Sequence, residues 1–127
     1  MSAFLSDEWL QSLTEASAEL RHDGGDQRVA ITVVGGPDGR RGFTVELRTG
    51  EGPAYIAGAQ ADADSSYELT YDDAVDQVCG GYDPALNYMT GSLKVKGATR
   101  PLFELFQLWA RPAHRDALAR VAAETRF

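Results

Sequence analysis

The stretch DPALNYMTGSLKVKG, residues 83–97, decides the fold because it joins a helical pattern to a strand pattern across two glycines. Asp83 is a favourable N-cap, and Pro84 occupies the first helical position, where its missing N–H costs nothing. Gly91 predicts the end of this short helix, and the LKVK run at 93–96 predicts a strand with both lysines outward. Here the chain returns from a helical layer to a sheet.

Four stretches upstream of this run alternate apolar and polar residues with the two-residue period of a β-strand. They are QRVAITVV (27–34), GFTVELRT (42–49), PAYIAGA (53–59) and SSYELTY (65–71). Each stretch has one polar face, which is typical of a largely antiparallel sheet that is covered on one side.

Helical patterns separate and follow these strands. Ser6 is a good N-cap for a helix that we expect to end at Gly24-Gly25, and Thr70 with Asp73 forms a capping pair for another. Further helical patterns cover 101–110 and 112–125. At 127 residues the chain has the length of one domain, and we expect that domain to span 1–127.

The charge distribution excludes one class of partner. The net charge is −7, and residues 49–93 contain no lysine or arginine, whereas residues 94–127 carry seven basic and three acidic side chains. A chain with so few basic residues before its final third has no stripe that could follow a phosphate backbone, so we expect no nucleic-acid partner. The single cysteine, the absence of a basic and apolar leader and the lack of a membrane-spanning run predict a cytoplasmic protein.

The helical pattern at 101–110 is more apolar than a surface helix requires. Its apolar residues cover an arc of roughly 220°, whereas one buried face needs only about 100°. Two explanations fit: the last helix covers the second flank, or part of the arc lines a cavity for an apolar molecule. Periodicity alone favours simple burial.

Reactive side chains form no recognisable catalytic or metal-binding pattern. Cys79 lies in an apolar helical pattern and is expected to be a buried small hydrophobe. His22 and His114 stand in polar surroundings and are expected to be exposed. The acidic residues between 62 and 76 lack the spacing of a calcium loop, and the glycines at 35–42 contain no phosphate-binding fingerprint. We predict no catalytic residue, no metal ion and no cofactor.

Three segments together resemble the sterol carrier protein type-two domain, also called the nonspecific lipid-transfer domain. They are GFTVELRTGEGPAYIAG (42–58), ADADSSYELTYDDAVDQVCGG (61–81) and DPALNYMTGSLKVKGATRPLFELFQLW (83–109). The third is the most specific, because it combines Asp-Pro, a short helix, a methionine before a glycine, a lysine-bearing strand and an apolar helix. The resemblance extends from about residue 28 to 109.

The resemblance implies an α/β (α+β) fold with a five-stranded, mostly antiparallel mixed sheet, helices over one face and an apolar tunnel between them. It also implies lipid binding and lipid transport without covalent chemistry, with a fatty acid, acyl-CoA, a sterol or a polyketide-like molecule as the guest. Bulky aromatic residues in the 101–110 helix favour a smaller or flatter guest than a sterol. The cavity residues that the resemblance implies are Phe43, Val45, Leu47, Val75, Val78, Leu86, Met89, Leu102, Phe103, Leu105, Phe106 and Trp109.

Two other functions remain open at this point. An enzyme of the cyclase or isomerase type would use the same cavity, and would need Tyr55, Tyr67, Tyr88, Asp76 or a histidine to point into it. A protein-interaction module would instead dock a partner on the apolar arc. The basic final third adds a further expectation, transient contact with anionic membranes through its arginines, Arg111, Arg115, Arg120 and Arg126.

Overall fold

The computed structural model describes residues 2–22, 24–37, 39–79, 89 and 94–127. Its centre is a five-stranded sheet in the order β4-β3-β2-β5-β6. The strands are β2 (Gln27–Gly36), β3 (Gly39–Leu47), β4 (Ala54–Ala57), β5 (Ser65–Thr70) and β6 (Lys94–Gly97). Neighbours are antiparallel except for β2 and β5, which run parallel. The expected mostly antiparallel mixed sheet is therefore confirmed.

The register brings the apolar faces of the strands together. Ile31 on β2 is opposite Phe43 on β3 and opposite Tyr67 on β5, and Val29 is opposite Val45. All five side chains are buried. Because side chains alternate along a strand, this pairing places the apolar residues of three neighbouring strands on one face.

Four helices occur in the described part of the chain: α1 (Asp7–Ala16), α2 (Tyr71–Val78), α4 (Thr99–Trp109) and α5 (Pro112–Ala123). The two predicted caps are present, because the Ser6 side chain accepts from the Trp9 N–H at 3.2 Å and the Thr70 side chain accepts from the Asp73 N–H at 3.2 Å. Pro112 occupies the first turn of α5, which fixes the break after α4.

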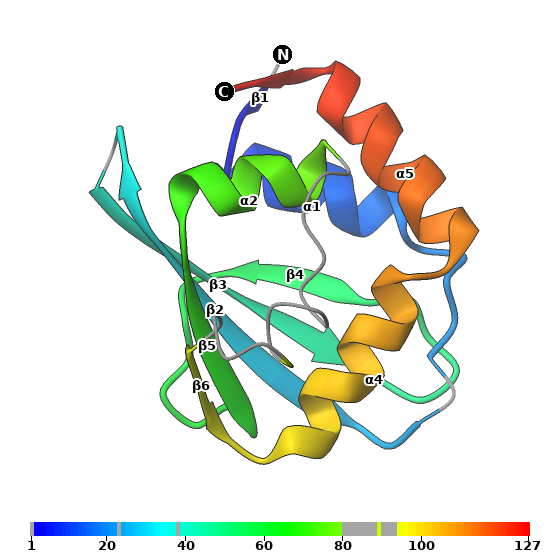
Figure 1. The fold of residues 1–127 in the computed structure, drawn as a ribbon. Coiled ribbons are helices and arrows are strands. Elements are labelled where there is room, and N and C mark those ends of the chain that lie inside the picture. The colour runs from blue at the N-terminus through cyan, green and yellow to red at the C-terminus, as the bar shows by residue number, and fades with distance from the viewer. Residues whose placement is uncertain (1, 23, 38, 80–88, 90–93) are drawn as a thin grey trace.

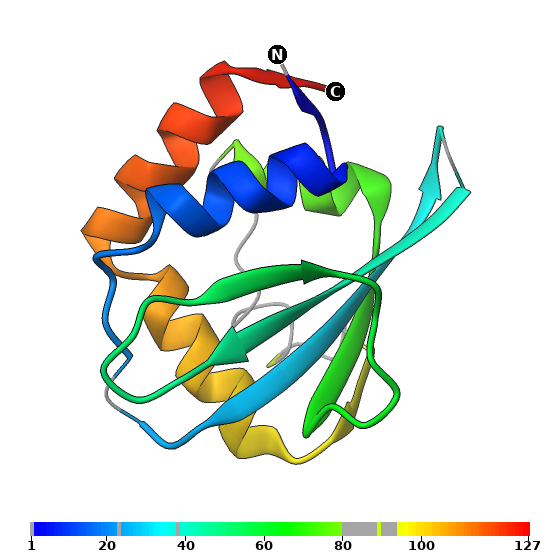
Figure 2. The ribbon, with the colours of Figure 1, turned by 180° about the vertical axis from the view of Figure 1, so that it is seen from behind.

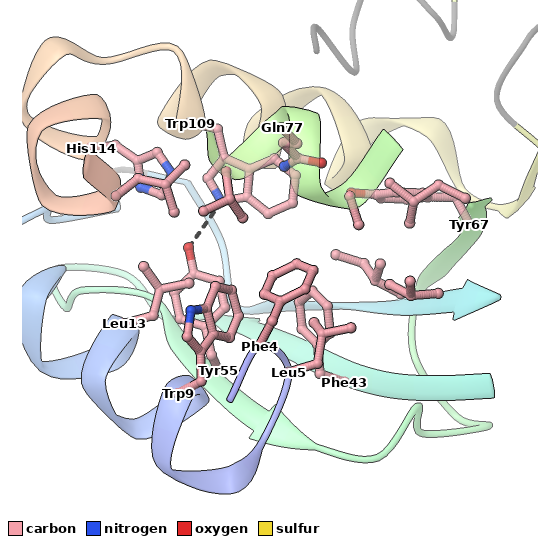
Figure 3. Close-up of a pocket in the computed structure, with 16 residues that line it drawn as sticks. Phe4, Leu5, Trp9, Leu13, Phe43, Tyr55, Tyr67, Gln77, Trp109 and His114 are labelled. Carbon is pink, nitrogen blue, oxygen red and sulfur yellow. Dashed lines mark hydrogen bonds between the residues drawn. The ribbon is translucent and has the colours of Figure 1, made fainter. Parts of the chain in front are cut away.

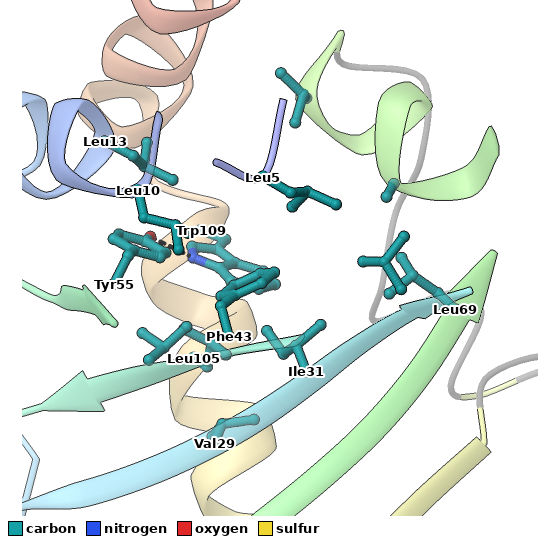
Figure 4. Close-up of a cluster of buried hydrophobic side chains, with 14 of the residues drawn as sticks. Leu5, Leu10, Leu13, Val29, Ile31, Phe43, Tyr55, Leu69, Leu105 and Trp109 are labelled. Carbon is teal, nitrogen blue, oxygen red and sulfur yellow. Dashed lines mark hydrogen bonds between the residues drawn. The ribbon is translucent and has the colours of Figure 1, made fainter. Parts of the chain in front are cut away.

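Helices α1, α2 and α4 pack against the sheet, and α5 packs across these three helices (Figures 1 and 2). The buried side chains between the two layers form one continuous cluster (Figure 4). In α4, Leu102, Leu105, Phe106, Leu108 and Trp109 are all buried. The wide apolar arc of this helix is therefore explained mainly by burial, against the sheet and against α5. This is the explanation that periodicity alone favoured.

The two ends of the chain meet in a short pairing that the sequence pattern did not predict. Strand β1 (Ser2–Ala3) runs parallel to β7 (Thr125–Arg126), at the top of Figure 1. Leu5 follows β1 with a φ of 65°, the left-handed region that leucine rarely adopts. The side chain of Leu5 is nevertheless buried, because this turn directs it toward the core.

The first helix is shorter than expected, ending at Ala16 instead of at Gly24-Gly25. The chain after α1 runs against the turn between β3 and β4, where a Cβ on Gly52 would lie 2.6 Å from the Ser17 carbonyl oxygen. This close approach redirects the chain before the glycines. The short helix predicted from Asp83 to Gly91 lies outside the described residues except at Met89. Among the described helices, none is long and apolar enough to cross a membrane.

Candidate functional site

A small apolar pocket lies between the sheet and the helical layer (Figure 3). Its free space is about 40 Å³. By the same measure one water molecule needs about 10–15 Å³, so the pocket has room for a few water molecules at most. The lining side chains are Phe4, Leu5, Trp9, Leu13, Ile31, Val33, Phe43, Tyr55, Tyr67, Leu69, Ala74, Gln77, Val78, Trp109, His114 and Leu118.

The sheet forms one wall of this pocket through residues of the four strands β2 to β5. These positions alternate with outward-facing ones, so the pattern that predicts the strands also predicts this wall. Phe43 and Tyr55 contribute aromatic rings with centroids 6.4 Å apart. Tyr67 extends the aromatic wall through β5, and its ring lies 6.1 Å from that of Phe106 on α4.

The N-terminal segment forms much of the opposite wall, and none of its residues is among the predicted cavity residues. Phe4 packs edge-on against Trp9, with ring centroids 4.9 Å apart. The Trp9 indole N–H donates to the Thr125 hydroxyl at 2.9 Å, which ties α1 to the end of the chain. The stripe of apolar residues along α1 was visible in the sequence, but periodicity could not show that it faces a pocket.

The end of the pocket that adjoins α5 carries polar groups. The Trp109 indole N–H donates to the Tyr55 hydroxyl at 2.9 Å, the dashed line in Figure 3. Burial raises the pKa of Tyr55 above its ordinary value, so this hydroxyl stays protonated at neutral pH. His114 stacks on Trp109 with centroids 6.2 Å apart and planes 23° from parallel. Burial lowers the pKa of His114 to about 4, so its imidazole is neutral at pH 7.

The predicted cavity residues occupy several different places. Phe43, Val78 and Trp109 line the pocket. Five others are buried in the core behind its walls, namely Val45, Leu47, Leu102, Leu105 and Phe106. Val75 is half-buried beside that core. Helix α4 places Phe103 on its outer side, 42% exposed, and Met89 is 78% exposed, while Leu86 lies outside the described residues.

Three expectations about reactive side chains were wrong. His22 and His114 are 4% and 3% exposed rather than solvated. His22 bonds to the Gly25 carbonyl oxygen through Nε2 at 3.0 Å, so local backbone packing encloses it. Cys79 is exposed because it is the C-cap of α2, one residue beyond the helical face that packs inward. No metal-binding group of three or more His, Cys, Asp or Glu occurs among the residues described.

A second, larger groove of about 240 Å³ lies beside the pocket. The two share Phe4, Leu5 and Val33 as walls. Arg41 and Arg126 also line the groove, and Arg41 Nη2 donates to the Leu5 carbonyl oxygen at 3.2 Å. The pocket and the groove therefore adjoin one another at the N-terminal segment and at Val33 of β2.

No protein-family model matches the chain, and no curated protein sequence matches it. Solved structures, in contrast, do match this chain. A crystal structure of sterol carrier protein 2 aligns with a TM-score of 0.66 and 19% identity, over 97% of this chain and 99% of that one. A Thermus thermophilus protein described as a candidate sterol carrier protein aligns with a TM-score of 0.65 and 20% identity, over 98% of this chain and 94% of that one.

A palmitated sterol carrier protein of Aedes aegypti, SCP2L2, aligns with a TM-score of 0.64 and 13% identity, over 87% of this chain and 96% of that one. Each of the three alignments with this chain covers nearly the whole of the other structure. The described structure therefore has the sterol carrier protein 2 fold.

Proposed function

We propose that this chain, whose fold is that of sterol carrier protein 2, binds a hydrophobic small molecule in the pocket between its sheet and helices and carries it without covalent chemistry. The observation that carries the proposal is the apolar lining of a pocket at the junction of the two layers. The palmitated Aedes aegypti structure supports a lipid as the guest, because its ligand-bearing fold is the same. Burial of apolar surface supplies about 25 cal/mol per Å², with little dependence on the guest's shape.

The pocket must enlarge for a guest to enter, because about 40 Å³ holds only a few water molecules. The neighbouring groove offers about 240 Å³ on the other side of Phe4 and Leu5. Displacement of these two side chains would join the two spaces. Leu5 has a strained φ of 65°, so a movement of this turn releases backbone strain while it exposes apolar surface. We propose this turn as the access route.

Two identical substitutions on α2 test the pocket. Val78 lines the pocket, whereas Val75, one helical turn earlier, does not. Val78→Phe fills free space with a ring and should weaken uptake of a fluorescent neutral lipid at least tenfold. Val75→Phe should leave uptake within about twofold of the unchanged protein. Thermal unfolding monitored by circular dichroism confirms that both variants fold; equal uptake by two folded variants would contradict the assigned pocket.

A specific observation also favours the second candidate function, an enzyme that uses the same pocket. Tyr55, Tyr67 and His114 line it, and these are residue types that the enzyme hypothesis required. Asp76 is exposed, and Tyr88 lies outside the described residues. Mass spectrometry of a guest recovered after incubation separates the two functions. A carrier returns the guest unchanged, whereas an isomerase or cyclase returns a product with the same mass and a different retention time.

We also propose transient contact with anionic membranes through α5. Arg115 and Arg120 are exposed on this helix, with Asp116 and Glu124 as their nearest acidic neighbours in sequence. Each basic side chain near an anionic surface contributes about 1 kcal/mol, and salt screens the attraction. Co-sedimentation with phosphatidylserine vesicles should occur at 10 mM salt and disappear at 300 mM. Sedimentation that persists in Arg115→Gln/Arg120→Gln would exclude this helix as the contact.

A further inference from the structure

His114 is one of the few polar side chains that line the mainly apolar pocket. It lies in the first turn of α5, is 3% exposed and stacks on Trp109. Its Nδ1 atom is buried and has no hydrogen-bond partner among the residues that the structure describes. A buried polar atom without a partner is unfavourable, and His114 is one of the residues that line the pocket, so a ligand there can supply the missing partner.

The charges around the pocket restrict what that partner can be. The lining side chains contain no lysine, arginine, aspartate or glutamate in the described structure. His114 itself is neutral at pH 7, because burial lowers its pKa to about 4. An ionised carboxylate or phosphate brought to this end would lose its hydration and meet no cation, which is strongly unfavourable. A neutral group that donates an O–H meets no such penalty.

We propose that His114 determines ligand specificity, and that its Nδ1 accepts a hydrogen bond from the hydroxyl of a neutral apolar ligand, such as a long-chain or cyclic alcohol. The Nε2 atom of the ring then carries the proton, because a neutral imidazole has one donor and one acceptor nitrogen. The Tyr55 hydroxyl accepts from the Trp109 indole N–H, which holds in place the ring on which His114 stacks. This inference rests on the proposed function.

The experiment compares three probes of equal chain length: 1-decanol, decanoate and decane, measured at pH 7.4 by displacement of a bound fluorescent lipid. We expect 1-decanol to bind at least tenfold more tightly than decanoate. His114→Phe keeps a ring on Trp109 and removes both nitrogens. This substitution should weaken the binding of 1-decanol about three- to tenfold, which is the usual effect of losing one hydrogen bond. It should leave the affinity for decane unchanged.

His114→Gln restores a carbonyl acceptor and should recover part of the affinity for 1-decanol. A second readout reports on Nδ1 directly: its ¹⁵N chemical shift should move when 1-decanol is added and stay constant with decane. A merely structural histidine would show neither the selective loss nor the selective shift.

The outcomes separate this inference from the proposed function. If His114→Phe weakens the binding of 1-decanol and of decane equally, the proposed role of His114 is wrong, but the carrier function is not contradicted. Decanoate that binds as tightly as 1-decanol would also overturn it. Failure of all probes to displace the fluorescent lipid, or of that lipid to bind at all, would contradict the pocket and the inference together.

Discussion

His114, on α5, is buried against Trp109, which belongs to the preceding helix α4. Phe43, Val78 and Trp109 are among the cavity residues that the family resemblance implies, and they line the pocket. His114 was expected on the surface because its neighbours in sequence are polar. Its burial results from contact with Trp109, which α4 brings to it across the break between the two helices. No local pattern contains that contact, so sequence reasoning could not predict it.

Acid should destabilise the fold through His114. The imidazole has an ordinary pKa of 6.5 in the unfolded chain and about 4 when folded, so the unfolded state binds the proton more readily between these values. Stability is therefore highest above pH 6.5, falls as the pH is lowered toward 4, and loses up to about 3 kcal/mol. Urea unfolding at pH 7.5 and 4.5 should show a smaller pH-dependent loss for His114→Phe than for the unchanged protein.

Carboxylates also titrate in this range, so the difference between the two proteins is the informative quantity. An identical loss in both would show that His114 accepts a proton as easily in the folded state as in the unfolded one.

The elements themselves could be predicted well, and their ends less well. Alternation located all five strands of the sheet. In β2 to β5 every strand has buried residues on one face, and in β6 the half-buried Val95 stands between two exposed lysines. The end of α1 was misplaced because it depends on the packing of Gly52 against Ser17, and these two residues are far apart in the sequence. The pairing of β1 with β7 was missed because two-residue strands have no periodicity.

Gly97, at the end of β6, gives a test at this scale. Its φ is 85°, and a Cβ there would lie 2.6 Å from the Asp64 carbonyl oxygen, on backbone that cannot move aside easily. Gly97→Ala should therefore lower the free energy of unfolding by about 2 kcal/mol or more, from positive-φ strain and steric overlap. Gly25 is the matched control, because its added Cβ meets nothing within 4 Å and its φ is not in the left-handed region.

Gly25→Ala should change the free energy of unfolding by less than about 1 kcal/mol. Equal chemical-denaturation midpoints for the two alanine variants would mean that the β5–β6 edge adapts to a side chain at residue 97.

The fold of the molecule is shared with structures of low sequence identity, whereas the free volume inside it depends on the particular side chains of this chain. Structures only 13–20% identical align over nearly their full length, because binary patterning and turn chemistry specify the layers. Binary patterning does not determine the free volume inside the fold, because that volume depends on the size of each side chain. The expected tunnel stays a prediction: aromatic residues occupy the interface between the layers and leave about 40 Å³.

A guest that binds the folded protein alone should raise its melting temperature. At a free concentration one hundred times Kd the stabilisation is about 2.7 kcal/mol, which corresponds to several degrees for a domain of this size. Differential scanning calorimetry with a titrated apolar guest should show a shift that grows with the logarithm of concentration. A melting temperature that stays constant at saturating guest would contradict binding to the folded state.

The positions of Trp9 and Trp109 make the protein its own optical reporter. The chain contains two tryptophans, and both indole rings border the pocket. Emission from either ring depends on the polarity and contacts of its surroundings, so arrival of a guest should alter intrinsic fluorescence without any attached dye. Replacing each tryptophan in turn by phenylalanine would then locate the guest along the pocket, nearer the N-terminal turn or nearer His114.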